Sequence, residues 1–550
     1  MTTSQSLIAP GRGATLDSAH VGDIKGAFGT ISTDDTGART STSARLKTLL
    51  AIVGPGLIVM VGDNDAGAFA TYGQAGQSYG TKLLWTFLLL IPVLYVNQEM
   101  VLRLGAVTGV GYAKLLLERF GRFWGAFSVI NLFFINALTI VTEFIGIVLA
   151  ARYLGVPKVL AVILAGLVIV LAASTGSLRR FERMAMIFCA GSLLLIPLYV
   201  LAHPPAGQMA SGLVVPSIPG GSGSLGTVML LVIGIVGTTV APWQLFFQQS
   251  YVIDKRITPR FMRYEKADLW IGILVVVIGG SALMGATAVA FAGTRHGQFT
   301  DAAGLAAGLA AYAGHAAGAI FAVALLDASM IGAFAVSLST AYAIGDVLGL
   351  KHSLHRGVKQ AKGFYAMYAA LIGLAAAVVL IPGSPLGLLT VGVQVLAGVL
   401  LPSATVFLLL LCNDKEVLGP WVNGKVTNAL GVVVVGVLVV LSAILMSAVL
   451  FGSVSSTVVI TILLAAVTAG VVVAAVVAVR GWRRRLAGEV QERPAVDRRT
   501  KENWRMPPLA MLAPVHMSAG RRAAMLAMWA YLCVAFVLVI VRVVQLALGH

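Results

Sequence analysis

The stretch that decides the fold is residues 48–71, TLLAIVGPGLIVMVGDNDAGAFAT. It is apolar and long enough to cross a bilayer, which takes about 20 residues of helix. The segment GDNDAG at residues 62–67 interrupts the apolar run and carries two acids. Each charged residue at the centre of a membrane helix costs about 2.5–3.5 kcal/mol on insertion scales, so two unpaired acids need a partner. A bound cation is the simplest partner, and we therefore expect a cation site in an interrupted membrane helix.

A second interrupted helix is expected five spans later, near residues 226–252. There the chain reads Ala241, Pro242, Trp243 and Gln244. Because Pro242 has no N–H, the carbonyl of Thr238 four residues earlier must find water, another donor or a metal. Two interrupted segments in corresponding positions of two halves are the best sequence indication of a transporter site. The layout predicts two inverted repeats of five helices with a site between them.

The composition indicates the class of protein. Of 550 residues, 58% are hydrophobic and only 11% are charged, whereas soluble proteins are about 45–50% apolar and about 25% charged. This excludes a soluble enzyme and a disordered chain, and it predicts an all-α polytopic membrane protein. The net charge of +17 does not indicate nucleic-acid binding, because the basic residues fall in short stretches between apolar segments.

The apolar stretches predict about thirteen membrane spans. They lie near 48–71, 82–105, 124–153, 157–177, 184–203, 226–252, 268–293, 317–348, 364–381, 386–411, 426–451, 456–479 and 524–546. Basic residues cluster in alternate loops, which places the N-terminus in the cytoplasm of a protein of the plasma membrane. The expected partners are the transported ion and the lipid bilayer, and the sequence indicates no obligatory protein partner.

The same pattern divides the chain into segments. Residues 1–47 are polar and are expected to be a disordered cytoplasmic tail. The transporter core covers 48–411, with repeats at about 48–203 and 226–411. The remaining segments are spans 11 and 12 in 412–479, a basic cytoplasmic segment in 480–523, and a final span in 524–550.

Motifs along residues 48–425 are similar to those of a known family. They are Gly54-Pro55-Gly56-Leu57, Asp65 with Gly67, Glu143-Phe144-Ile145-Gly146, Gln394, Leu401-Pro402 and Asn413-Asp414. Together they resemble the Nramp divalent-metal transporters. The resemblance implies a LeuT-like fold with discontinuous first and sixth spans and about three extra C-terminal spans. It also implies metal transport rather than enzymatic activity, with the metal as substrate and no cofactor.

The departures from that family are specific. Its metal-binding motif Asp-Pro-Gly-Asn is replaced by Asp65-Ala66-Gly67-Ala68, and its Met-Pro-His by Ala241-Pro242-Trp243. An aspartate that serves the family's proton pathway falls at Ile140. These changes resemble the Nramp-related magnesium transporter branch, whose first break carries the same Asp-Asn-Asp-Ala-Gly string.

The side chains at the two breaks predict which ion is bound. The expected ligands are Asp63, Asn64, Asp65, Thr238 through its carbonyl, and Gln244. All offer hard oxygen, which suits Mg²⁺ and would also accept Mn²⁺, and the sulfur and imidazole that favour softer metals are missing. The helix breaks themselves are formed by Gly62, Gly67 and Pro242.

Other residues are expected to line the cavity or the ion path. They are Ala68, Ala241, Trp243, Glu143, Asp327 and Gln394. The two alanines would leave room for a hydrated ion. An acid within a membrane span is a functional hypothesis by default, although Glu143 or Asp327 could instead form a structural hydrogen bond.

Several rival functions stay open. A conventional proton-coupled Mn²⁺/Fe²⁺ transporter is the main alternative. An organic-solute symporter is disfavoured, because two acids at the first break would repel a substrate carboxylate. An intramembrane enzyme is disfavoured by the lack of a His-Glu-x-x-His pair. A channel is disfavoured by the two broken helices, which favour alternating access.

Overall fold

Helices make up almost all of the computed structural model, which describes residues 17–219, 225–292, 301–382 and 386–451, with scattered positions between 461 and 537. In these ranges nine helical segments are long and apolar enough to cross a membrane. They are Trp85–Thr108, Arg122–Tyr153, Leu178–Ala202, Thr227–Asp254, Pro259–Ala290, His315–Leu348, Lys362–Leu380, Leu389–Cys412 and Lys425–Ile444. A bent pair, Thr42–Ile52 with Pro55–Val61, would make a tenth. The predicted spans 456–479 and 524–546 fall mostly outside the described residues.

The first predicted span is three helices rather than one. They are α1 (Thr42–Ile52), α2 (Pro55–Val61) and α3 (Ala66–Tyr79). The axes of α1 and α2 differ by 53°. Between α2 and α3 the chain is not helical, and the Asp65 side chain accepts a hydrogen bond from the N–H of Ala68 at 2.8 Å, which caps α3. The predicted interruption in this span is confirmed.

The sixth predicted span is also broken, into α11 (Leu225–Thr239) and α12 (Pro242–Asp254). Pro242 is the first residue of α12, where a missing N–H costs no helical hydrogen bond. A side chain at Gly237 would overlap the backbone of α17 (Leu386–Cys412). This glycine therefore allows α17 to lie directly against the helix that ends at the break.

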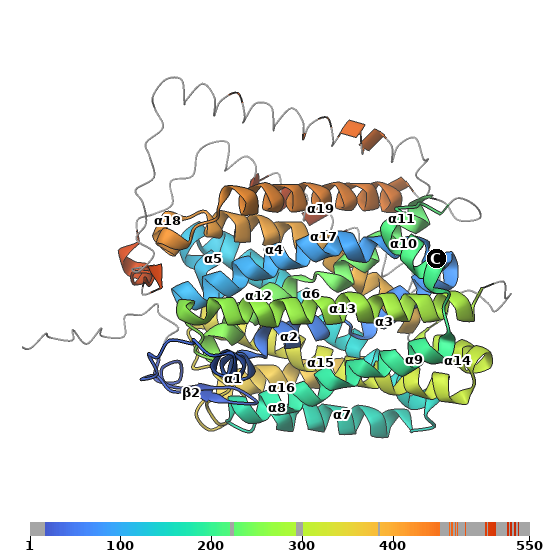
Figure 1. Ribbon diagram of the computed structural model, residues 1–550, viewed down its shortest axis with the longest axis horizontal. Helices are drawn as coiled ribbons and strands as arrows, with labels where there is room; N and C mark the ends of the chain where they lie inside the picture. The colour runs from blue at the N-terminus through green and yellow to red at the C-terminus, as the bar shows by residue number, and fades with distance from the viewer. Residues whose placement is uncertain are drawn as a thin grey trace, which may run out of the picture.

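The remaining long helices pack around these two broken spans. They are α4 (Trp85–Thr108), α6 (Arg122–Tyr153), α7 (Lys158–Ala173), α8 (Leu178–Gly191), α9 (Leu195–Ala202), α13 (Met262–Ala290), α15 (His315–Leu348), α16 (Lys362–Leu380) and α19 (Lys425–Phe451). In Figure 1, α13 crosses the molecule in front of α2 and α3, and contacts between residues confirm that it packs on both. Helix α15 packs along α6. The residues at both breaks are buried within this packing, with Asp63, Asp65, Val240 and Ala241 among them.

Short elements complete the fold. The α-helices are α5 (Tyr112–Phe120), α10 (Ala206–Val214), α14 (Ala302–Ala313) and α18 (Lys415–Leu418). The 3-10 turns are η1 (Gly80–Leu83), η2 (Ser192–Leu194), η3 (Pro259–Phe261), η4 (Gly419–Trp421) and η5 (Leu509–Met511). Helix α14 is formed by an Ala- and Gly-rich stretch, AAGLAAGLAAYA.

The prediction that residues 1–47 are disordered is wrong for residues 17–47, and residues 1–16 lie outside the described residues. An antiparallel pair, β1 (Ile24–Lys25) and β2 (Thr30–Ile31), lies against the helix bundle. Arg179 donates hydrogen bonds to the carbonyls of Gly26 and Gly29, and Arg183 donates to that of Ala27. The segment has too few apolar residues for a core of its own, and distant arginines hold its backbone instead.

Candidate metal site

Asp63 and Gln244 join the two breaks directly. The amide nitrogen of Gln244 donates a short hydrogen bond to Asp63 Oδ1 and another, of 3.2 Å, to the carbonyl of Thr239. The amide oxygen of Gln244 accepts a hydrogen bond of 2.7 Å from Gln98 on α4. The second carboxylate oxygen of Asp63 has no hydrogen-bond partner in the described part of the chain. It is therefore available to a ligand, whereas Gln244 would have to turn its amide to offer oxygen.

Asp65 lies on the other side of the same break and is also fully enclosed. Besides capping α3, its Oδ1 lies 3.5 Å from the Thr238 hydroxyl, which donates to it. Thr238 thus reaches the acid with its hydroxyl, whereas the sequence predicts its carbonyl as the ligand. Asp63 is 0% exposed and Asp65 is 2% exposed, so both carboxylates are shut off from solvent on both sides in this structure.

Glu143 on α6 adds a third buried acid. Its Oε2 accepts a hydrogen bond of 3.2 Å from the N–H of Ala66 at the start of α3. A side chain at Gly332 on α15 would lie 2.7 Å from the Glu143 carboxyl carbon and 3.1 Å from Cβ of Asp65. The two acids therefore share the space that this glycine leaves. None of Asp63, Asp65 and Glu143 pairs with a basic side chain in the described ranges.

The predicted lining residues gather around these acids. The ring of Trp243 lies over Gly62, where a side chain would come within 3.2 Å of it, and a side chain at Gly67 would overlap the amide of Gln394. Ala68 and Ala241 are buried beside them. Close packing thus requires a glycine at Gly67, and it leaves little room for a side chain at Gly62.

The described residues contain no group of three or more His, Cys, Asp or Glu side chains arranged to hold a metal. The carboxylates at the breaks would therefore share an ion with amide, hydroxyl or carbonyl oxygens, or with water. Mg²⁺ is usually bound in that manner, through one or two carboxylates and several retained waters. Every side-chain donor at the breaks is oxygen or an amide, as the sequence predicts.

Two predicted residues lie apart from this group. The amide nitrogen of Asn64 lies 3.5 Å from the carbonyl of Val276 on α13, to which it donates. Its neighbours are α13, η2 and α15, and it lines a small cavity with Asp327 of α15. The structure therefore gives Asn64, predicted as a ligand together with Asp63 and Asp65, a different set of contacts.

Several residues that hold the site are not predicted from the sequence. Gln98 orients Gln244, and the Tyr72 hydroxyl lies 2.6 Å from that of Thr239. Ser339 on α15 donates to the carbonyl of Trp243 at 2.8 Å. The sequence could have indicated Gln98 as a site residue, because it belongs to a polar Asn-Gln-Glu triplet in the second apolar span. The other contacts depend on helix packing, and no sequence pattern indicates them.

Buried charges close the bundle on the side where the N-terminal segment lies. Nζ of Lys255 donates to the carbonyls of Ile52 and Val53 at 2.6 and 2.9 Å, and to Glu182 at 2.6 Å. The carboxylate of Asp268 accepts the N–H groups of Gly54, Gly56 and Leu57 at 3.1, 2.7 and 3.3 Å. The bend between α1 and α2 is therefore fixed to α8, α12 and α13.

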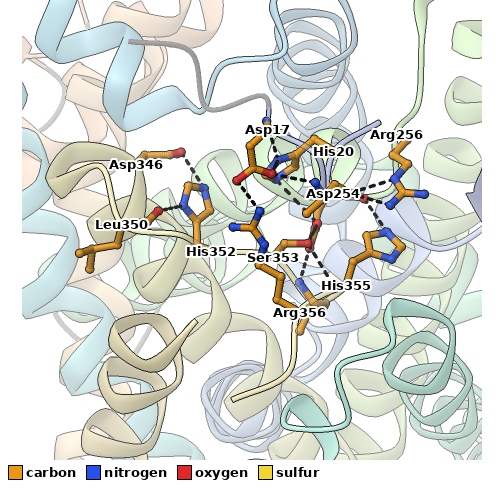
Figure 2. Close-up of polar contacts among 12 residues, drawn as sticks. Asp17, His20, Asp254, Arg256, Asp346, Leu350, His352, Ser353, His355 and Arg356 are labelled. Carbon is orange, nitrogen blue, oxygen red and sulfur yellow. Dashed lines mark hydrogen bonds and ion pairs between the residues drawn. The ribbon is translucent and has the colours of Figure 1, made fainter. Parts of the chain in front are cut away.

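The N-terminal segment covers this closed side and is itself held by polar contacts (Figure 2). Asp254, at the end of α12, accepts hydrogen bonds from the Ser353 hydroxyl at 2.5 Å and from the N–H of Leu354 at 2.8 Å. Arg356 forms an ion pair of 2.8 Å with Asp17. Arg256 donates two hydrogen bonds to the carbonyl of Ala19. The ends of α12 and α15 and the N-terminal segment thus form one connected layer.

His352 is a buried titratable group in this layer with a shifted pKa. Burial alone would lower its pKa, but the hydrogen bond to Asp346 at 3.0 Å and the charge of that carboxylate raise the pKa of His352 to about 9. The imidazole is therefore charged at neutral pH, and it links the loop after α15 to the end of that helix.

Comparisons with known proteins identify the family. The model described as natural resistance-associated macrophage protein-like, Nramp, matches residues 56–448. This chain belongs to the Nramp family. The divalent metal cation transporter MntH of Ralstonia nicotianae is 30% identical over 400 residues, covering 70% of this chain and 88% of that protein. The protein of the same name from Yersinia enterocolitica is 26% identical over 413 residues, covering 72% and 93%.

A solved structure agrees at the level of fold. The crystal structure of the Eremococcus coleocola manganese transporter matches 80% of this chain and 96% of its own, with a TM-score of 0.58 and 20% sequence identity. The predicted all-α, LeuT-like fold is confirmed. As a member of the Nramp family, the chain is a multi-pass membrane transporter, not an enzyme. Nramp transporters carry the metal as substrate and use no cofactor.

Proposed function

We propose that this Nramp protein moves Mg²⁺, and also Mn²⁺, across the plasma membrane by alternating access. The ion is held partly hydrated between the broken first and sixth spans. Asp63 and Asp65 are its carboxylate ligands, and Thr238 and Gln244 supply further oxygens. The observation that carries the proposal is the position of these two acids: both are buried at a helix break, neither has a described basic partner, and they face the second break.

Without a bound cation, two ionised carboxylates in this position would destabilise the protein. Removing an ionised carboxylate from water without compensation costs several kcal/mol even after relaxation. A divalent cation would offset both charges at once. The relatives support a divalent metal as cargo, because they are named as a divalent metal cation transporter and a manganese transporter.

The preference for Mg²⁺ over softer metals rests on what is missing at the second break. A thioether or an imidazole there would favour transition metals, and the chain has Ala241 and Trp243 at these positions. Mg²⁺ dehydrates reluctantly, so a site that leaves it several waters suits it better than a close-fitting one. Mn²⁺ accepts the same oxygen ligands, so both ions are expected as substrates.

Alternating access requires the closed side to open. With the N-terminus in the cytoplasm, that side is the inner one, and opening it must separate α1 and α2 from Lys255 and Asp268. The polar contacts of these two residues are buried, so they can be exchanged for water only when the helices move apart. Opening is therefore an all-or-none rearrangement of this group rather than a gradual widening.

Proton coupling separates this proposal from its main alternative, a conventional proton-coupled Mn²⁺/Fe²⁺ transporter. Two titratable positions of the family are lost here, at Ile140 and Trp243. We infer that metal uptake is not tightly coupled to protons. Glu143 is the observation that favours the alternative, because it contacts the first break and its Oε1 has no hydrogen-bond partner in the described ranges.

The test is uptake into proteoliposomes that enclose a pH-sensitive dye. Competition of Mg²⁺ against Mn²⁺ uptake is measured in the same vesicles. We expect millimolar Mg²⁺ to be transported and to compete with Mn²⁺, with no fixed ratio of acidification to metal entry. Mn²⁺ uptake that ignores millimolar Mg²⁺ and acidifies the interior in proportion would establish the alternative.

A further inference from the structure

A basic cleft lies at the end of the bundle where the N-terminal segment packs. Its walls are residues 37–39 of that segment, η3 with the first turn of α13, and Trp421 of η4. Its volume is about 420 Å³, and pockets that bind small molecules usually have about 300–1,000 Å³. None of the described residues at the two helix breaks lines it. The cleft is therefore separate from the candidate metal site.

The charged side chains of the cleft are mostly basic. The basic ones are Arg39, Arg260, Arg263 and Lys266, and Glu502 is the one acid among the described lining residues. Glu502 is exposed, so water and salt screen its charge. The cleft therefore has an excess of positive charge, which favours an anion.

Two of the four basic side chains already have acid partners. Arg39 forms an ion pair of 2.7 Å with Asp35, and Lys266 forms one of 2.8 Å with Glu99. Their charges are largely balanced within the protein. The charge left for a ligand is therefore that of the other two side chains.

These two, Arg260 and Arg263, form no ion pair with another described residue. The guanidinium of Arg260 lies 5.3 Å from the ring centre of Phe261, and it donates hydrogen bonds to two backbone carbonyls of the N-terminal segment. The guanidinium of Arg263 lies 5.6 Å from the ring centre of Tyr264. An aromatic ring holds a guanidinium in place and leaves N–H groups at its edge for an anion.

The face of α13 that carries Arg263 continues as a surface that faces lipid. Trp270, Leu274 and Ile278 follow on that face at helical spacing. They are 40%, 52% and 63% exposed, as expected of apolar side chains that meet acyl chains. Trp270 stacks on Tyr95 of α4 with the ring centres 4.9 Å apart, and such aromatic residues are enriched at the level of lipid headgroups. Arg263 therefore lies next to the headgroup layer.

We propose that the cleft binds the headgroup of an anionic phospholipid whose acyl chains lie along this face of α13. The phosphate accepts hydrogen bonds from Arg260 and Arg263, and the guanidinium fork matches phosphate oxygens. No side chain caps the start of α13, so the positive end of its helix dipole adds to the attraction. A phosphatidylcholine headgroup is disfavoured, because its choline cation meets the excess positive charge.

A lipid in this cleft connects the N-terminal segment to α13. Arg39 belongs to that segment, Arg260 holds two of its carbonyls, and Asp268 of α13 caps the start of α2. The bound lipid therefore stabilises the closed side of the bundle. The inference does not depend on which metal is carried.

The experiment is native mass spectrometry of the purified full-length protein in a neutral detergent, with dioleoylphosphatidylglycerol as the probe. We expect one lipid per chain to be retained most strongly, with an affinity at least about fivefold lower in Arg263→Gln, because one of two guanidinium contacts is lost. Arg263 is exposed and its side chain makes no hydrogen bond or ion pair to a described residue, so this variant should fold as the parent does.

Arg180→Gln is the matched control for loss of a positive charge. Arg180 is exposed at the start of α8, at the same end of the bundle, and it does not line the cleft. This variant should retain the lipid as the parent does. Equal retention by the parent and by Arg263→Gln, or an equal loss in both variants, would overturn the proposal.

Two competitors identify the ligand. Dioleoylphosphatidylcholine at the same concentration should not displace the anionic lipid, and equal retention of the two lipids by the parent would contradict the proposal. Millimolar glycerol 3-phosphate should not displace it either, because it lacks the acyl chains. Displacement by this compound would overturn the lipid assignment and identify a soluble phosphate compound as the occupant. No transport is measured, so failure of the proposed function leaves the result unaffected.

Discussion

Asp268 should be one of the strongest single contributors to the closed side of the bundle. Its carboxylate caps the start of α2 from another helix, accepting the N–H groups of Gly54, Gly56 and Leu57. The first two of these donors are buried and the third is partly buried. A buried donor left without a partner costs about 1–3 kcal/mol, so Asp268→Ala should lower the free energy of unfolding by about 2–6 kcal/mol from the two buried donors alone.

Asp268→Asn should cost less than Asp268→Ala, because its amide oxygen can still accept from one or two of these groups. The assay is denaturant-induced unfolding of the purified protein in detergent, followed by tryptophan fluorescence. Asp301→Ala is the control, because the hydrogen bond by which Asp301 caps its own helix through Gly304 is exposed and its loss should cost only about 0.5–2 kcal/mol. Equal losses for Asp268→Ala and Asp301→Ala would refute the reasoning.

Three further predictions concern other parts of the molecule. His352→Gln should remove a stabilising contact with Asp346 of up to about 3 kcal/mol. Because the pKa of His352 is raised from 6.5 to about 9, the deficit should be full below pH 6.5 and should vanish as the pH rises past 9; a constant deficit from pH 6 to pH 10 in unfolding titrations would contradict this. Asp63→Ala should raise the metal concentration for half-maximal uptake at least about tenfold, since one charged contact is lost, and an unchanged value would show that Asp63 faces elsewhere during transport. Ala241→Met combined with Ala68→Asn should shift uptake toward Mn²⁺ and lower Mg²⁺ uptake, and an unaltered Mg²⁺ to Mn²⁺ ratio in competition assays would count against the assigned geometry.

The broken helices could be predicted from the sequence because their causes are local. Two acids within an apolar run, and a proline that removes an N–H, act on the residues next to them. The lengths of most spans followed for the same reason, since apolar runs set them. For one long helix the ends also agree closely, because the span predicted near 317–348 is α15, His315–Leu348, whereas the first span, predicted near 48–71, runs from Thr42 to Tyr79.

The order of the N-terminal segment could not be predicted, because its cause lies far along the chain. Its sequence is polar and has no core of its own, yet Glu182 accepts the N–H of Ala27 at 2.6 Å, and Arg256 holds the carbonyl of Ala19. The partners are 155 and 237 residues away. Local composition indicates how a segment behaves alone and carries no information about such contacts.

The orientation of side chains at the site was likewise beyond the sequence. Asp63, Asn64 and Asp65 are consecutive, and all three carry oxygen, so the sequence grouped them as ligands. In the non-helical break successive side chains point in different directions: Asp63 meets α12, Asp65 meets α11, and Asn64 meets α13. Only the packing of those helices decides which oxygen faces which cavity.

The central claim is that Asp65 holds the transported metal, and the most direct measurement is the initial rate of radioactive Mn²⁺ uptake by Asp65→Ala in proteoliposomes. Asp301→Ala, at an exposed helix cap, serves as the control for loss of an acid elsewhere. We expect Asp65→Ala to be folded and monodisperse, with uptake no faster than in protein-free vesicles, while Asp301→Ala transports like the parent. Near-parental uptake by a well-folded Asp65→Ala protein would contradict the assignment of the metal to the break in the first span.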